Sequence, residues 1–140
     1  MSLVSIRAAL EAALAGMSST LVTGYENVPF SPPAENIPYQ TCWLAPVEPL
    51  DQEVSGSHYW ERGLFQVNLF YPTGSEARGT KAAVEQAQLT RQTFDHGNTF
   101  AAGGIVVRVT ATPEVTPGRN EGERYVISVR VRYEAQVTRS

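Results

Sequence analysis

The sequence predicts an α+β fold: a single domain over residues 1–140, with a mostly antiparallel sheet packed by two helices. Two segments, at residues 2–17 and 76–94, repeat apolar or small residues at three- and four-residue steps, which is the helical period. Other segments alternate apolar and polar residues, which is the period of a half-buried strand. The length of 140 residues suits one domain and is too short for two ordinary ones.

The first helix is predicted from the apolar face formed by Leu3, Ile6, Leu10, Ala13, Leu14 and Met17. Ser2 can cap this helix and Gly16 can end it. The segment superficially resembles a signal peptide, but Arg7 and Glu11 interrupt its apolar stretch and no basic residue precedes it. Its polar face is not basic, so we interpret it as a helix that packs on the core rather than on a membrane surface.

Residues 24–38 are predicted to be an extended connector because four prolines interrupt them. A strand follows from Tyr39 to about Pro46, and residues 48–57 form an acidic, turn-rich loop. The clearest strand covers residues 58–72. There Phe65, Val67, Leu69 and Tyr71 point one way, and Gln66, Asn68 and Phe70 point the other way.

The second helix is predicted from about Glu76 to Phe94, with Ser75 as its N-cap. Its small residues Ala83 and Ala87 would let it lie close to the sheet. After a turn at residues 95–98, strands are predicted at residues 105–111 and 124–137. A long hairpin connection, residues 112–123, joins these two strands.

The stretch from Tyr71 to Lys81 resembles a nucleotide-binding loop, since Gly74 and Gly79 have the spacing of a P-loop. However, Thr80 and Lys81 stand in the reverse of the required order. The exchange rotates each side chain by roughly 100° about a helix, away from the phosphates and the magnesium ion. We therefore interpret the stretch as a turn. A small ligand-binding domain or enzyme that uses this turn remains the least favoured alternative.

No catalytic, cofactor-binding or metal site is predicted. His58 and His96 stand apart from each other and from Cys42, whereas a metal site needs three or four ligands. Cys42 lies in an apolar strand, which favours a packed thiol over a nucleophile. The carboxylates of one predicted loop are interpreted as solvated; they are Glu114, Glu121 and Glu123.

Charge and composition exclude several classes of protein. The net charge is −3 and the pI about 5.4, whereas a general nucleic-acid binder carries a basic excess. No run of about 18 apolar residues predicts a membrane span. The single cysteine excludes an intrachain disulfide, which fits folding in the cytoplasm.

Two features predict contact surfaces. Long loops on a compact domain are often contact surfaces, which selects Pro32 and Pro33 in residues 24–38, and Arg119 and Glu121 in residues 112–124. Three arginines lie on the polar faces of the last two predicted strands: Arg108, Arg130 and Arg132. If those strands are neighbours, the arginines form a basic stripe. Such a stripe is either ordinary surface charge or a surface that faces an acidic subunit or DNA passing through a ring.

The order of elements resembles a known family. A helix and a Pro-rich connector precede GLFQVNLFYPTGSEARGTKAAVEQAQLTRQTF, and FAAGGIVVRV and YVISVRVRYEA follow. This layout is similar to that of the tail terminator proteins of tailed bacteriophages and prophages. The most recognisable part is the strand that ends in Pro72-x-Gly74 and leads into an Ala-rich helix with Phe94 at its end.

The resemblance implies a structural protein with no catalytic residues and no cofactor. It implies a hexameric ring at the tail–neck junction of the virion, made in the cytoplasm of the host bacterium. The ring would cap the tube of major tail protein, end its polymerisation and offer a surface to the head-completion proteins. DNA would pass through its bore. The alternative is another neck or minor tail protein, such as a head–tail joining subunit; gene order would separate the two.

Overall fold

The computed structural model describes residues 2–17, 21–26, 28–33, 37–51, 56–73, 78–122 and 124–138. In these residues two helices and eight strands form one α+β unit, which confirms the predicted fold class. The helices are α1 (Ser2–Ala15) and α2 (Arg78–Thr93). The strands are β1 (Val22–Tyr25), β2 (Tyr39–Pro46), β3 (His58–Pro72), β4 (Thr99–Ala102), β5 (Ile105–Val109), β6 (Glu114–Val115), β7 (Arg119–Glu121) and β8 (Arg124–Thr138).

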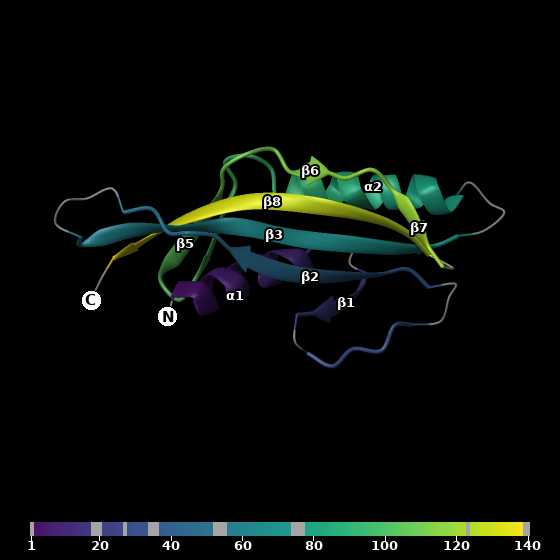
Figure 1. The fold of residues 1–140 in the computed structure, drawn as a ribbon, viewed down its shortest axis with the longest axis horizontal. Coiled ribbons are helices and arrows are strands. Elements are labelled where there is room, and N and C mark those ends of the chain that lie inside the picture. Colours follow the sequence, from purple (N-terminus) through teal and green to yellow (C-terminus); the bar gives the residue numbers. More distant parts are fainter. Residues whose placement is uncertain are drawn as a thin grey trace.

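The sheet is built around its two longest strands. β3 and β8 pair antiparallel along their full lengths, from His58 opposite Thr138 to Pro72 opposite Arg124. Figure 1 shows them side by side along the long axis of the molecule. The strand order is β1-β2-β3-β8-β5-β4, and β6 and β7 also pair with β8. Only the β1–β2 pairing is parallel among the described strands, so the sheet is mostly antiparallel, as predicted.

The core lies on one face of this sheet, where both helices pack. Alternation along β3 turns Phe65, Val67 and Leu69 towards this face, and none of the three is exposed. Burial of a side chain of this size contributes about 1.5–3 kcal/mol. The helices add six buried residues to the same cluster: Ile6, Ala9, Leu10, Leu14, Ala83 and Ala87. Phe94, which follows α2, belongs to it too. In Figure 1 both helices lie behind the long strands, and the opposite face carries no helix.

The small residues of α2 lie where the sequence predicts them. Ala83 and Ala87 are buried against the core, and Phe94 follows the helix and packs its ring 5.7 Å from that of Phe65. Gly16 follows α1 and donates its amide hydrogen to the carbonyl of Ala12, so the predicted end of that helix is confirmed. Leu3 is an exception on the first helix. It was predicted on the packed face, but 43% of it is exposed, because it belongs to the first turn.

Three stretches predicted to be irregular contain strands. β1 occupies the start of the predicted connector, where Gly24 lies under the ring of Phe30; a Cβ atom at Gly24 would come within 2.8 Å of that ring. β6 and β7 lie within the predicted hairpin connection and add hydrogen bonds along β8. These strands have four residues or fewer, too short to show a periodic pattern in the sequence.

The fourth strand was also missed, although the sequence contains its signal. β4 and β5 pair through a turn at Gly103 and Gly104, whose φ angles are +55° and +80°. Two residues with positive φ match the type I′ turn, the favoured connection of a two-residue hairpin. The Gly-Gly pair between apolar residues therefore marks the hairpin.

Candidate functional site

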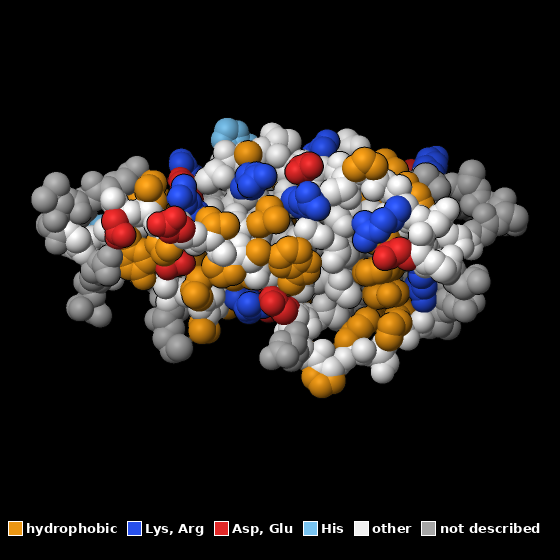
Figure 2. Space-filling model, viewed as in Figure 1, with side chains coloured by type: hydrophobic (Ala, Val, Ile, Leu, Met, Phe, Trp, Pro, Cys, Tyr) orange, Lys and Arg blue, Asp and Glu red, His pale blue; other side chains and the backbone are white. Residues whose placement is uncertain are grey.

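The candidate site is the sheet face that no helix covers, which we call the open face. The alternation and register of β2, β3 and β8 place on it Thr41, Trp43, Ala45, Leu64, Gln66, Asn68, Phe70, Ser128, Arg130 and Arg132. Most of these side chains are half-buried by their neighbours in the sheet, and Ser128 is buried. Figure 2 shows this side of the molecule, where apolar side chains lie between Lys and Arg side chains. The face is thus mixed in polarity, as contact surfaces are.

Hydrogen bonds fix the polar side chains at the centre of the open face. The side chain of Asn68 accepts from the Ser128 hydroxyl at 2.6 Å and from the Gln66 amide at 2.7 Å. Its own amide donates to the Thr41 hydroxyl at 3.4 Å, so the bonds extend over three strands. Arg130 donates through Nε to Gln66 at 3.2 Å. The bonds hold these side chains in one arrangement. Binding of a partner therefore costs less side-chain conformational entropy.

Stacked aromatic rings lie at one end of the open face. The rings of Tyr39 and Phe70 stack 4.5 Å apart, and the Arg124 guanidinium lies 4.8 Å from the centre of the Tyr39 ring. Arg124 also donates to the carbonyls of Ile37 at 2.7 Å and Pro33 at 3.0 Å. Arg124 of β8 therefore connects the Pro-rich connector to the sheet through these hydrogen bonds.

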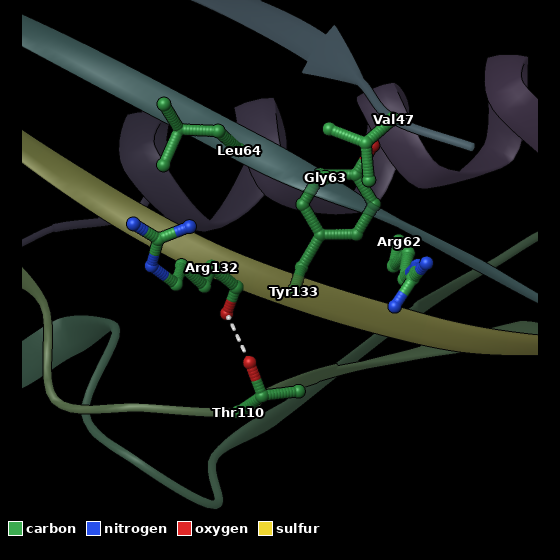
Figure 3. Close-up of a pocket in the computed structure, with 7 residues that line it drawn as sticks. All are labelled: Val47, Arg62, Gly63, Leu64, Thr110, Arg132 and Tyr133. Carbon is green, nitrogen blue, oxygen red and sulfur yellow. Dashed lines mark hydrogen bonds between the residues drawn. The ribbon is translucent and has the colours of Figure 1, made fainter. Parts of the chain in front are cut away.

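A hollow of about 250 Å³ lies at the other end of the open face. Its lining residues are Val47, Arg62, Gly63, Leu64, Thr110, Arg132 and Tyr133. Figure 3 shows Arg62 and Arg132 on opposite sides of the Gly63–Tyr133 pair, with Val47 and Leu64 beside it. The hollow is therefore cationic on two sides, with the apolar side chains of Val47 and Leu64 and the polar Thr110 among its other walls.

The three arginines of the predicted stripe have different surroundings. β5 and β8 are neighbours, which was the condition for the stripe. However, Arg108 lies opposite Glu134 and forms an ion pair with it, and this carboxylate interrupts the stripe. Arg130 is opposite Glu114 in register and binds Gln66.

The other predicted interface residues lie elsewhere. Pro32 is exposed, and Pro33 is half-buried beneath the contact with Arg124. Arg119 and Glu121 are exposed on β7 and form an ion pair at 3.5 Å. Of the seven residues selected from the sequence, Arg130 and Arg132 lie among the open-face positions of β2, β3 and β8. Arg108 lies opposite Glu134, on the same side of the sheet.

Sequence reasoning did not select the apolar members of this face, Trp43 and Leu64, nor Arg62 at its end. The signal that could have selected them is the set of alternating residues on each strand whose side chains point away from the core. On β3 the more apolar set, Phe65, Val67 and Leu69, lies in the core, whereas on β2 the core set is Gln40, Cys42 and Leu44. From the other set on β2, β3 and β8, only the arginines of β8 were selected as a contact surface.

The cysteine and the P-loop-like stretch lie in ordinary structural positions where the structure describes them. Cys42 is buried, and burial raises the pKa of its thiol to about 12, which leaves it protonated at neutral pH. Gly74 and Ser75 lie outside the described residues, whereas Gly79, Thr80 and Lys81 fall within the first turn of α2. Glu123 also lies outside the described residues.

Two properties of the described part of the chain bear on the class of site. No cluster of three or more His, Cys, Asp and Glu side chains in it is arranged to hold a metal ion. None of its helices has both the length and the apolar character to cross a membrane.

Comparisons with known proteins agree on the fold. A family model described as Phage tail terminator protein matches residues 5–133, nearly the whole chain. Among solved structures, a chain whose name gives no function matches with a TM-score of 0.75 and 26% sequence identity. That match covers 96% of this chain and 96% of the other chain. No curated protein matches.

Proposed function

The chain belongs to the phage tail terminator protein family, and from this premise we propose that it caps the tail tube and ends tube polymerisation. As a member of that family it is a structural protein of the phage tail. In our proposal it acts as a hexameric ring at the tail–neck junction of the virion. One side of the ring would bind the last layer of major tail tube protein, and the other would bind head-completion proteins.

The open face is the observation that supports this proposal most. It is wide, it is held rigid by bonds across three strands, and it mixes apolar and cationic side chains. Such a surface suits binding to another folded protein better than it suits chemistry on a small molecule. In a ring six identical contacts act together, so each single contact can be weak.

The proposal is tested by following polymerisation of the tube subunit from the same phage or prophage. Purified tube subunits are allowed to assemble with and without this chain, and tube lengths are measured by negative-stain microscopy. We expect substoichiometric amounts of the chain to shorten the tubes and to be found at one tube end. Unchanged tube lengths, with the chain absent from the ends, would refute the capping role.

A further inference from the structure

We propose that the hollow between Arg62 and Arg132 is a subunit contact, which receives the outer surface of α2 from a second copy of this chain. We define that outer surface by Val84, Glu85, Gln88 and Leu89, all exposed. In the contact, Glu85 of one copy lies between the two guanidinium groups of the next. The inference rests on the proposed ring and identifies the surfaces that build it.

Some arginines of the described residues are ion-paired with carboxylates, and the two beside the hollow are not. Arg7 lies 2.7 Å from the Glu26 carboxylate, and Arg108 and Arg119 are also ion-paired. By contrast, Arg62 donates through Nε to the backbone carbonyl of Glu48, and Arg132 is ion-paired with no carboxylate of the described residues. Two guanidinium groups beside one hollow, neither with a carboxylate partner there, form a site for a carboxylate.

The shape and polarity of the hollow select a protein side chain as its occupant. Its volume of about 250 Å³ is below the usual range for sites that enclose small molecules. Its apolar walls include Val47, which is 51% exposed, and Leu64. DNA phosphates would gain nothing from those walls, and the net charge of −3 opposes DNA binding. An acidic side chain next to an apolar one matches the walls and the arginines together.

The outer surface of α2 has this chemistry. Val84 and Leu89 are 45% and 38% exposed, and Glu85 lies between them on the helix. Glu85 forms an ion pair with Lys81 at 3.8 Å, and both side chains are largely exposed. Exposed pairs of this kind contribute little to stability, so Glu85 can exchange Lys81 for a pair of arginines.

The two surfaces lie on opposite sides of the molecule. α2 packs on the inner face of the sheet and turns its outer surface away, whereas the hollow lies on the open face. A contact between unlike surfaces is heterologous, and repeated heterologous contacts close into a ring when the rotation permits. The contact would also cover the second face of the sheet with a helix, an arrangement found in folds that carry helices on both faces of a sheet.

Charge exchange tests the contact in tails assembled inside cells. Arg132→Glu and Glu85→Arg are each expected to lower the amount of this chain in purified tails at least tenfold. The triple variant Arg62→Glu/Arg132→Glu/Glu85→Arg is expected to restore it to within about twofold of the wild type, because the charges on both sides of the contact are then reversed. Arg119→Glu, which changes the charge equally on β7, serves as the matched control and is expected to have no effect.

Cross-linking identifies the occupant directly. Tails carrying both Leu64→Cys and Val84→Cys are treated with a short bismaleimide, and the single-cysteine variants are the controls. We expect a ladder of linked copies only from the double variant, since buried Cys42 does not react. No ladder in tails that contain the protein, or links only to a different protein or to DNA, would overturn the inference. Complete absence of the wild-type chain from tails would instead refute the proposed function.

Discussion

At the scale of single residues, Tyr133 is a buried polar side chain whose position is explained by packing. Its side chain is 1% exposed, and its hydroxyl has no hydrogen-bond partner among the described residues. The hydroxyl lies so near Gly63 that a Cβ atom there would be 2.6 Å from it. Glycine on β3 therefore makes room for a large ring on β8, and the ring replaces the packing that glycine lacks.

We expect Tyr133→Phe to leave the free energy of unfolding unchanged or to raise it by up to about 1 kcal/mol. The substitution removes a buried polar group that makes no bond, and it keeps the ring. Urea denaturation of the two proteins at pH 7 measures the difference. A loss of more than about 1 kcal/mol would mean that the hydroxyl has a partner which this structure does not contain.

Burial of three titratable residues makes the fold sensitive to alkaline pH. The pKa of Cys42 is raised from 9.0 to about 12, and those of Tyr71 and Tyr133 from 10.0 to about 12, in each case chiefly by burial. The unfolded chain therefore loses these protons at lower pH than the folded protein does. Stability is full below about pH 9 and falls as the pH rises towards 12.

At pH 10.5 we expect the free energy of unfolding to be lower than at pH 8 by about 1 kcal/mol for each tyrosine. The measurement is the midpoint of urea denaturation at the two pH values. The Tyr71→Phe/Tyr133→Phe variant is the control, and its stability is expected to fall less over the same interval. An equal fall in both proteins would show that other groups cause the effect.

At the scale of secondary-structure elements, long periodic segments were predictable and short ones were not. The sequence predicts β3 from residue 58 to 72, as the structure has it, because bulky strand-forming residues fill this segment and buried positions alternate from Phe65 to Tyr71. β6 has only two residues and is held by its pairing with β8 and by packing of Val115 on the core. A strand whose stability comes from its partner leaves no pattern in its own residues.

The small residues of α2 set its distance from the sheet. Ala87 is 1% exposed, so we expect Ala87→Leu to cost about 1–3 kcal/mol by overpacking the core. Ala12→Leu, at an exposed position of α1, is the matched control and is expected to change stability by less than about 0.5 kcal/mol. Thermal denaturation measures the loss of stability in both variants. Equal losses would mean that the small side chain of Ala87 does not set the distance between α2 and the sheet.

Arg124 is expected to control the order of the Pro-rich connector. Arg124→Met would remove its bonds to Ile37 and Pro33 and its contact with the Tyr39 ring. We expect amide hydrogen exchange at Val28, Phe30, Ser31 and Ile37, the non-proline residues of 28–33 and 37–38, to become at least tenfold faster, with little change in α1. Unchanged exchange in the connector would show that the packing of Phe30 on Gly24 is sufficient to hold it.

At the scale of the whole molecule, the fold leaves one face of a broad sheet uncovered, and the proposed function depends on that face. The sequence predicts the core face well, because burial imposes a strict alternation. It predicts the contact surface poorly: Arg132 was selected, but Arg62 and Leu64 were not. Their significance comes from a register between distant strands, in which Leu64 lies opposite Arg132.

The central claim is that this chain ends the growth of the tail tube. Its most direct test is the distribution of tail lengths, measured by electron microscopy of a lysate in which the gene is deleted, with the complemented strain beside it. We predict tails of widely varying length and few particles with joined heads, both corrected by complementation. Tails of uniform, normal length joined to heads in the deletion lysate would contradict the account.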